Sequence, residues 1–157
     1  MTAGSSRHDG HRQRSRARRR ALQALYQWQV AGQDLGAIEK QFLEEYRMGD
    51  TDVDYFRELL HRIPAGLSAI DAAIDPVLDR PFVTLDPVER AILRIGAYEL
   101  AERLDIPYRV IINEAVEMAK VFGAEQSHRY INGVLDKVGR ANRFRAAEVG
   151  TNGRSRN

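Results

Sequence analysis

The chain has 157 residues, of which 43% are hydrophobic and none is cysteine. This length predicts one domain with tails, and the absence of cysteine excludes disulfides, thiolate nucleophiles and cysteine metal ligands. No apolar run is long enough for a membrane span or a secretory leader, so we expect a cytoplasmic protein with no membrane partner.

Charge is unevenly distributed along the chain, although the net charge is only +2. Residues 1–20 carry seven Arg and one Asp, and residues 140–157 carry five Arg and one Glu. Of the 24 basic and 22 acidic residues, 12 and 20 remain for residues 21–139, which gives this body a net charge of −8. Basic ends indicate a polyanion, and an acidic body indicates a basic partner. The alternative is that the acidic surface only aids solubility.

The first half of the chain shows three helical patterns separated by capping residues. Residues 1–12 should form a flexible basic arm, since their Gly, Ser and His content is typical of disorder. Asp34 is the expected N-cap of a second helix, and Thr51 or Asp52 that of a third. The first helix should end near Gly32, because apolar residues lie at helical spacing before it: Ala17, Ala21, Leu25 and Trp28.

A long apolar seam follows, with members three or four residues apart: Phe56, Leu60, Ile63, Leu67, Ile70 and Ile74. Pro64 lies within this seam and lacks the N–H group that would bond to the Leu60 carbonyl. The pattern therefore predicts either one bent helix or two helices that separate near Pro64.

The second half of the chain contains the clearest helix start. Asp86 and Pro87 suit an N-cap and a first helical position, and Glu89 would complete a capping box. The helix that follows is apolar on most sides, so we expect it at the centre of the core. Two further helices are predicted, one closed by Gly123 and one capped by Ser127.

No segment alternates with the period of a strand, so the fold class is all-α with about seven helices. The folded domain should span residues 13–139, and residues 140–157 should form a basic, disordered tail. The chain has no glycine-rich phosphate loop and no hydrolase or metalloprotease motif, and its four histidines lack metal-ligand spacing. We therefore expect a binding protein rather than an enzyme, with no catalytic residue, metal or cofactor.

Arginines crowd the start of the first helix. Projected at 100° per residue, Arg14 and Arg18 continue its core-facing side beyond the last apolar residue, so we expect them to overhang the edge of the bundle. Guanidinium-rich segments bind RNA phosphates and stack on unpaired bases. The alternative is an arm that aids solubility or binds any polyanion.

Five longer segments carry a more specific signal: RRRALQALYQWQ at 18–29, FRELL at 56–60, ERAILRIGAYEL at 89–100, IPYRVIINEAVEMAKVFG at 106–123 and SHRYINGVLDKV at 127–138. Together they resemble the NusB family of transcription antitermination factors, in its proteobacterial form. The resemblance implies one compact domain of two small helical bundles. It also implies binding to single-stranded boxA RNA with NusE, a small-subunit ribosomal protein, and assembly with NusA and NusG on elongating RNA polymerase.

The resemblance also assigns residues to the RNA surface. Arg14, Arg16 and Arg18 match the family's arginine-rich motif, to which we add Arg12 from the same segment. Two aromatic positions of the family correspond to Phe122 and Tyr130, although Phe122 also lies on an apolar stripe that favours the core. Gln126 stands where the enterobacterial form has an acidic residue. Arg94 maps to the RNA side, but could equally pair with a carboxylate of the body.

For NusE, the resemblance indicates the capped helix start, with Asp86, Glu89 and Arg90 as contacts. Capping and partner contact compete for the Glu89 carboxylate. Two alternative functions stay open. One is a helical adaptor that binds only proteins, and the other is an RNA-binding domain related to those of rRNA cytosine methyltransferases, for whose catalytic domain 157 residues leave no room unless the chain is a fragment.

Overall fold

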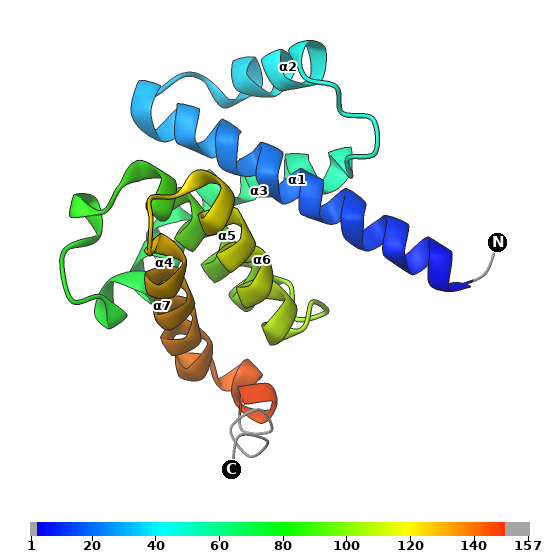
Figure 1. The fold of residues 1–157 in the computed structure, drawn as a ribbon. Coiled ribbons are helices and arrows are strands. Elements are labelled where there is room, and N and C mark those ends of the chain that lie inside the picture. Colours follow the sequence, from blue (N-terminus) through cyan, green and yellow to red (C-terminus); the bar gives the residue numbers. More distant parts are fainter. Residues whose placement is uncertain (1–2, 150–157) are drawn as a thin grey trace. The chain divides into compact units, whose positions relative to one another are not determined.

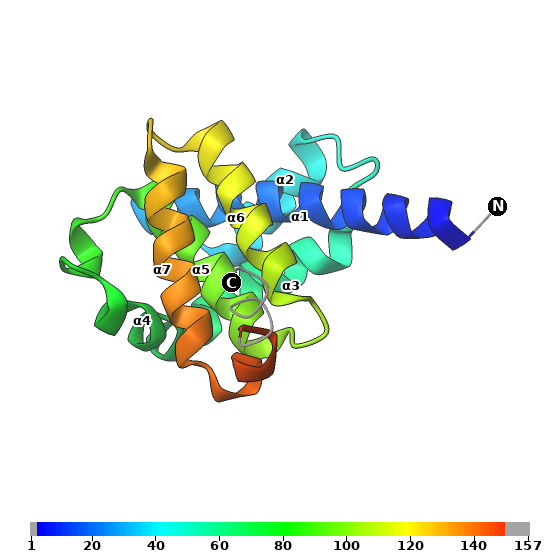
Figure 2. The same cartoon turned by 60° about the horizontal axis from the view of Figure 1, so that its bottom comes forward.

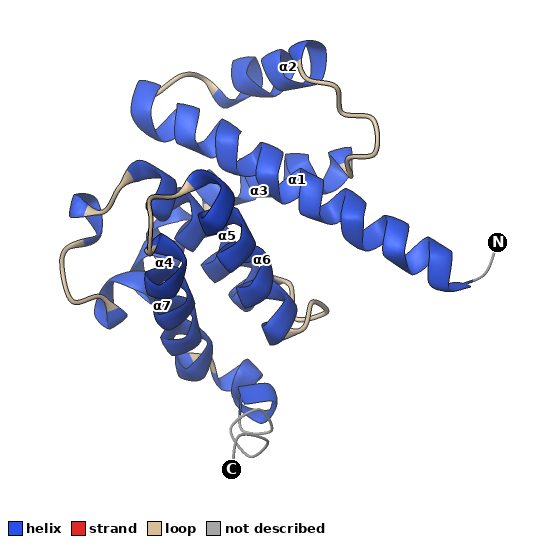
Figure 3. Ribbon diagram, viewed as in Figure 1, coloured by secondary structure: helices blue, strands red, loops and turns tan. Residues whose placement is uncertain are grey.

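The computed structural model describes the backbone of residues 3–149 and the side chains of residues 9–149. Within that range the regular structure consists of seven α-helices and three short 3₁₀ helices, η1 to η3 (Figure 3). This confirms the expected all-α class and the number of helices. Residues up to 65 form one compact unit, unit 1, and residues from 66 onward form another, unit 2. No helix in the described part of the chain is both long and apolar enough to cross a membrane.

Unit 1 contains the helices α1 (Ala3–Ala31), α2 (Leu35–Glu45) and α3 (Val53–Ala65). Helix α1 packs against both of the others, and its N-terminal turns extend beyond them (Figure 1). Three residues of the stripe predicted from helical spacing, Ala17, Ala21 and Leu25, are buried in this core, whereas Trp28 is only half-buried. The buried apolar residues of α2 and α3 include Ile38, Phe42 and Phe56.

The predicted helix ends of unit 1 are confirmed. Gly32 follows α1 with a φ of +65°, which glycine adopts without steric cost. The Asp34 carboxylate accepts a hydrogen bond from the Ala37 amide at 3.1 Å. Of the two candidates before α3, Asp52 is the one whose carboxylate accepts a bond from a helix amide, that of Tyr55 at 3.0 Å. Pro64 lies in the last turn of α3, so the apolar seam breaks into two helices there.

The N-terminal segment differs from the expectation. Helix α1 already begins at Ala3, so the structure shows no break in helical geometry near residue 12, where we expected a flexible arm to end. Once a helix exists, each added residue gains one hydrogen bond for one residue fixed, which favours propagation through the Arg, Gln and Ala residues here. Residues 1 and 2 lie outside the described part.

Unit 2 is built around α5 (Pro87–Glu102), which packs against α4 (Leu67–Ile74), α6 (Tyr108–Phe122) and α7 (Ser127–Ala141). Every residue from 91 to 100 is buried, which confirms the prediction that this helix lies at the centre of the core. The 3₁₀ helices η1 (Asp75–Val77) and η2 (Phe82–Thr84) connect α4 to α5. After α7, the chain continues into η3 (Arg143–Arg145).

Two glycines allow the helices of unit 2 to approach closely. A Cβ atom placed on Gly96 of α5 would lie 2.6 Å from a methyl group of Leu135 on α7. A Cβ atom on Gly139 of α7 would overlap the ring of Tyr108, the first residue of α6. By contrast, a Cβ atom on Gly133, in the same helix as Gly139, would meet no atom within 4 Å.

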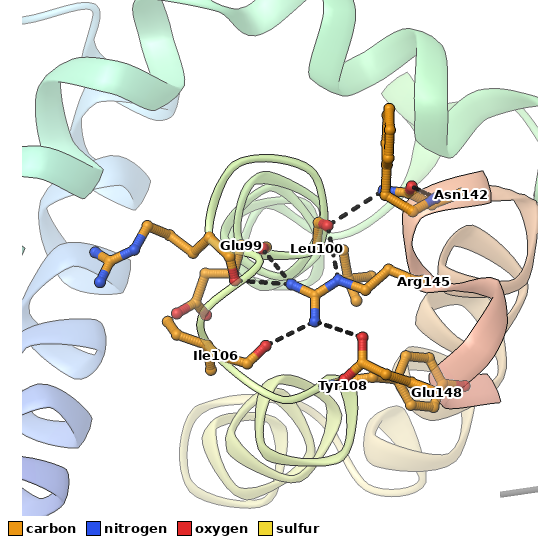
Figure 4. A network of polar contacts seen from close by, with 9 residues as sticks. Glu99, Leu100, Ile106, Tyr108, Asn142, Arg145 and Glu148 are labelled. Carbon is orange, nitrogen blue, oxygen red and sulfur yellow. Dashed lines mark hydrogen bonds and ion pairs between the residues drawn. The ribbon is translucent and has the colours of Figure 1, made fainter. Parts of the chain in front are cut away.

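The segment after α7 is anchored by a buried arginine. The Arg145 side chain is 0% exposed and points at the C-terminal end of α5 (Figure 4). Among the described residues, its guanidinium donates to four backbone carbonyls, those of Glu99, Leu100, Arg103 and Ile106, at 2.6–3.1 Å. The last carbonyls of a helix lack partners inside the helix and carry partial negative charge, so a cation is favourable there.

The same segment also caps the start of α6. Glu148 accepts a bond from the Tyr108 amide at 3.0 Å with one carboxylate oxygen, and with the other it pairs with Arg145 at 3.0 Å (Figure 4). The cation therefore lies at the C-terminus of one helix and the anion at the N-terminus of the next, which are the favourable positions. The prediction of a disordered tail from residue 140 is wrong for residues 140–149, and residues 150–157 lie outside the described part.

Replacing Arg145 with Met should lower the free energy of unfolding by about 3–5 kcal/mol, because four carbonyls and the Glu148 carboxylate lose a buried partner. Urea denaturation followed by circular dichroism measures this change. The matched control is Arg143→Ala, which removes an exposed arginine of the same 3₁₀ helix and should change stability by less than about 0.5 kcal/mol. Equal urea midpoints for the Arg145 variant and the parent would contradict the anchoring role.

Replacing Gly139 with Ala should destabilise the protein by about 1–3 kcal/mol, since the new methyl group must displace the Tyr108 ring. Gly133→Ala in the same helix should instead stabilise it by up to about 1 kcal/mol, because alanine favours helix and the methyl group points into open space. Thermal melting of the two variants would test this, and shifts of the same sign would refute the packing argument.

Candidate nucleic-acid interface

One arginine of the α1 segment is part of the core. The Arg18 side chain is only 1% exposed, and its guanidinium lies 5.6 Å from the ring centroid of Tyr55 on α3. The expectation that Arg18 overhangs the bundle is therefore wrong. The helical projection placed Arg18 on the correct side of α1, but α3 extends far enough to cover it.

The neighbouring arginines also make contacts within unit 1. The Arg14 guanidinium lies 5.4 Å from the Tyr55 ring centroid, and that of Arg20 lies 4.7 Å from the ring of Tyr46. Arg16 pairs with Asp50 at 3.1 Å, and both side chains remain largely exposed. Aromatic rings and a single carboxylate thus hold these side chains in defined places before any ligand arrives.

Among the α1 side chains that the structure describes, three arginines present their charge to solvent: Arg12, Arg16 and Arg19. Arg14 and Arg20 are half-buried, with their ring contacts described above. Unit 1 therefore offers a row of guanidinium groups along the N-terminal half of α1. Groups of this kind bind phosphate oxygens and stack on bases.

In unit 2, the turn between α6 and α7 differs from the prediction. Ser127 is the first residue of α7 rather than its cap, and its buried hydroxyl has no hydrogen-bond partner among the described residues. Gln126 occupies the N-cap position with a φ of +70°, the only positive φ of a non-glycine residue in the described part. A Cβ atom on Gly123 would lie 3.1 Å from the Ser127 hydroxyl, so this turn is tightly packed.

Just after this turn, Tyr130 forms a cluster with two residues of the α4–α5 connection. The Arg80 guanidinium lies 4.8 Å from the Tyr130 ring centroid, and the Tyr130 hydroxyl donates to Asp79 at 3.3 Å. Partial burial raises the pKa of the Tyr130 hydroxyl, which therefore stays protonated at neutral pH. No local pattern in the sequence indicated that Arg80 would meet a residue 50 positions later in the chain.

The other residues expected on the RNA side are less available. Phe122 is the last residue of α6 and its side chain is half-buried. It therefore belongs partly to the core and partly to the surface, in line with both interpretations of the sequence. Arg94 is mostly buried and forms two hydrogen bonds with the Asp71 carboxylate, at 3.0 and 2.9 Å. The same guanidinium lies 4.9 Å from the ring centroid of Phe82. The predicted alternative for Arg94, an ion pair within the body, is confirmed.

The start of α5 shows how the predicted partner contacts are used. The Asp86 carboxylate accepts a bond from the Val88 amide at 2.7 Å, so Asp86 caps the helix as predicted, although on the second rather than the third helical residue. Arg90 donates to the carbonyls of Val83 and Leu85 at 3.0 and 3.2 Å, and so holds the preceding turn. At that turn Val83 is 77% exposed, a feature that sequence periodicity did not reveal.

The described residues therefore carry arginines on α1, an arginine–tyrosine pair beside α7 and a rigid turn before α5. They contain no group of three or more His, Asp or Glu side chains placed to hold a metal ion. A family model described as the NusB family matches residues 15–140.

The chain belongs to the NusB family. The transcription antitermination protein NusB of Alkalilimnicola ehrlichii is 57% identical to it, over 89% of this chain and 88% of that protein. The protein of the same name from Halorhodospira halophila is 55% identical, over 88% and 89%. A solved structure of T. maritima NusB has a TM-score of 0.73 and 34% identity, and covers 82% of this chain and 91% of that one. Residues 141–149 lie beyond the family match.

Proposed function

We propose that this chain is a transcription antitermination factor that binds single-stranded boxA RNA together with NusE. It would act without catalysis, in the cytoplasm, as a subunit of the elongating RNA polymerase complex that also contains NusA and NusG. The names of its relatives support the antitermination role. The observation that supports RNA binding is the occurrence in both units of arginines that lie over aromatic rings, half-buried Arg14 and Arg20 in unit 1 and exposed Arg80 in unit 2.

On unit 1, the phosphate-binding groups in this proposal are Arg12, Arg16 and Arg19, with Arg14 beside them. Arg18 has a different role, since its buried guanidinium fixes α1 against α3. Phosphate contacts of exposed arginines are electrostatic, so affinity should fall steeply with salt.

On unit 2, Tyr130 and Arg80 form the base-stacking element of the proposal. A base can stack on the tyrosine ring or on the flat guanidinium above it, because both present a planar surface. Gln126 lies four residues before Tyr130 and is exposed, so RNA near the turn meets a neutral amide there. Phe122 adds a half-buried ring at the other side of the turn. We leave Arg94 out of the RNA surface, because its guanidinium is engaged with Asp71.

For NusE, the proposed contact is the turn before α5, with Val83 at its exposed tip and Asp86 and Glu89 on the first turn of the helix. An exposed apolar side chain flanked by carboxylates suits a basic protein partner. Arg90 would act indirectly, by holding the carbonyls of the turn in place.

The double substitution Arg12→Ala/Arg16→Ala should weaken binding to boxA-like RNA, because two exposed phosphate-binding groups are lost. The slope of log affinity against log salt should become shallower by about 1.4, or about 0.7 per lost contact. Fluorescence anisotropy of a labelled boxA-like RNA measures both quantities. A charge-matched control is Lys40→Ala/Arg62→Ala, which removes exposed cations of α2 and α3. An equal loss of RNA affinity in the two double variants would argue for a general attraction of polyanions and against a specific RNA surface.

Reversing the charge of Glu89 with Lys should weaken binding to NusE by about tenfold or more, since like charges would face each other across the interface. RNA affinity of the free protein should change much less. Isothermal titration with NusE and anisotropy with RNA separate the two effects. Glu117→Lys, on the exposed face of α6, is the control. A Glu89 variant that binds NusE as well as the control does would rule out this interface.

A further inference from the structure

The outer face of α7 carries basic side chains at helical spacing. Arg129, Lys137 and Arg140 are exposed, and with Gly133 they occupy positions i, i+8, i+11 and i+4 of one helical stripe. The charges continue past the end of the helix with exposed Arg143 in η3. Helix α7, which carries this stripe, runs from the α6–α7 turn towards the segment that contains η3 (Figure 2).

Little negative charge opposes the stripe. Residues 127–149 contain five basic and two acidic residues, a net charge of +3 in a unit whose preceding segments are acidic. One acid, Asp136, pairs with Arg140 at 2.9 Å, and the other, Glu148, pairs with the buried Arg145. Arg129, Lys137 and Arg143 form no ion pair with any residue in the described part of the chain. Three cations of the stripe therefore remain available to a ligand.

An aromatic ring is displayed at the far end of the stripe. Phe144 is 65% exposed, and the Arg143 guanidinium lies 4.8 Å from its ring centroid. The backbone on either side is fixed, since Asn142 donates to the Leu100 carbonyl at 3.2 Å and Arg145 is fully buried. The Phe144 amide also donates to the Asn142 side chain at 2.9 Å. A rigid backbone thus holds an apolar ring in water, where it gains nothing for the fold.

An arginine guanidinium lies over an aromatic ring at each end of α7. At its start the Arg80 guanidinium lies 4.8 Å from the Tyr130 ring, and after its end the Arg143 guanidinium lies at the same distance from Phe144. Tyr130 and Ala141, the last residue of α7, are 11 residues apart, which corresponds to roughly 16 Å along the helix, and Phe144 follows in η3. Between them Gly133 leaves open space above the helix surface, so a ligand can approach the backbone closely.

We propose that this stripe, with the Arg143–Phe144 pair at its end, is a second binding surface for single-stranded RNA. The cations would bind the phosphates of nucleotides that flank the boxA element, and Phe144 would stack on one of their bases. The inference rests on the proposed function, which it extends from Tyr130 towards the C-terminus. Arg143 and Phe144 lie beyond residues 15–140, the part that matches the NusB family.

The alternation of cations with stacking rings favours RNA over an acidic protein. Phosphates repeat along a nucleic acid strand and every base has a flat face, so a row of cations with a ring at each end matches that ligand. An acidic protein would use the cations but would have no regular use for an exposed ring on a rigid support. A stripe that is merely solvated would not need the ring at all.

The test compares three RNAs by fluorescence anisotropy: a boxA-like core, the core extended by about ten uridines at its 5′ end, and the core extended by about ten uridines at its 3′ end. The parent protein should bind one of the extended RNAs more tightly than the core. Phe144→Ala should reduce this gain by about tenfold, and Phe144→Tyr should retain it. Arg143→Ala should make the salt slope for the extended RNA shallower by about 0.7. Arg109→Ala, on the exposed face of α6, serves as the charge-matched control and should leave the gain unchanged.

Failure of this inference can be told apart from failure of the proposed function. Core RNA that does not bind at all would refute the function. Core RNA that binds, with no gain from either extension or with a full gain in Phe144→Ala, would refute the second surface alone. If Phe144→Ala keeps the gain but loses binding to an acidic protein partner, the surface is a protein-docking site and the inference is also wrong. Thermal melting should show that both Phe144 variants are as stable as the parent.

Discussion

Unit 2 depends on the hydrogen bonds and the ion pair that the buried guanidinium of Arg145 makes. It satisfies carbonyls at the C-terminus of α5, while its ion-pair partner Glu148 satisfies the first amide of α6. The Arg145–Glu148 pair therefore bridges the two ends of the turn between α5 and α6, with each charge placed where the helix dipole favours it. Since α6 packs against both α5 and α7, the position of Tyr130 on α7 depends on that turn.

Burying a guanidinium costs free energy of folding unless each of its N–H donors has a hydrogen-bond acceptor. The desolvation of a guanidinium amounts to several kcal/mol, and it is offset only when the geometry is good and the hydrogen bonds are complete. Here backbone carbonyls and one carboxylate provide those acceptors. Unit 1 uses a different solution for Arg18, whose guanidinium lies over the ring of Tyr55. In both units, arginines that would be read as ligand-binding from sequence are part of the core.

Local signals in the sequence predicted the helices well and their long-range contacts poorly. The caps at Asp34 and Asp86 and the break after Pro64 follow from short-range backbone chemistry, and all three are confirmed. Ser127 was expected to cap α7, but it is the first helical residue and Gln126 occupies the N-cap position. Local sequence signals also could not reveal that residues 140–149 are ordered, because Arg145 bonds to carbonyls about 40 residues earlier in the chain.

The residues of the candidate site likewise fall into those that the sequence predicted and those that only the fold reveals. Helical projection correctly gave α1 a row of arginines, yet it could not show which of them α3 would cover. The family resemblance indicated Tyr130, whereas the contribution of Arg80 required the fold, because a turn 50 residues earlier provides it. Val83 and Phe144 were missed for another reason: each is an apolar residue held in solvent, and a pattern that assigns apolar residues to the core has no place for them.

The position of the Arg145–Glu148 pair in the chain has a consequence for folding during synthesis. Both residues leave the ribosome after every helix whose ends they cap, while the whole of unit 1 has been translated well before. Domains generally fold as units, the N-terminal one first. Unit 1 can therefore fold on the ribosome, whereas the turn between α5 and α6 stays uncapped until residue 148 emerges. A nascent chain paused at the end of α7 would expose that turn to chaperones and proteases.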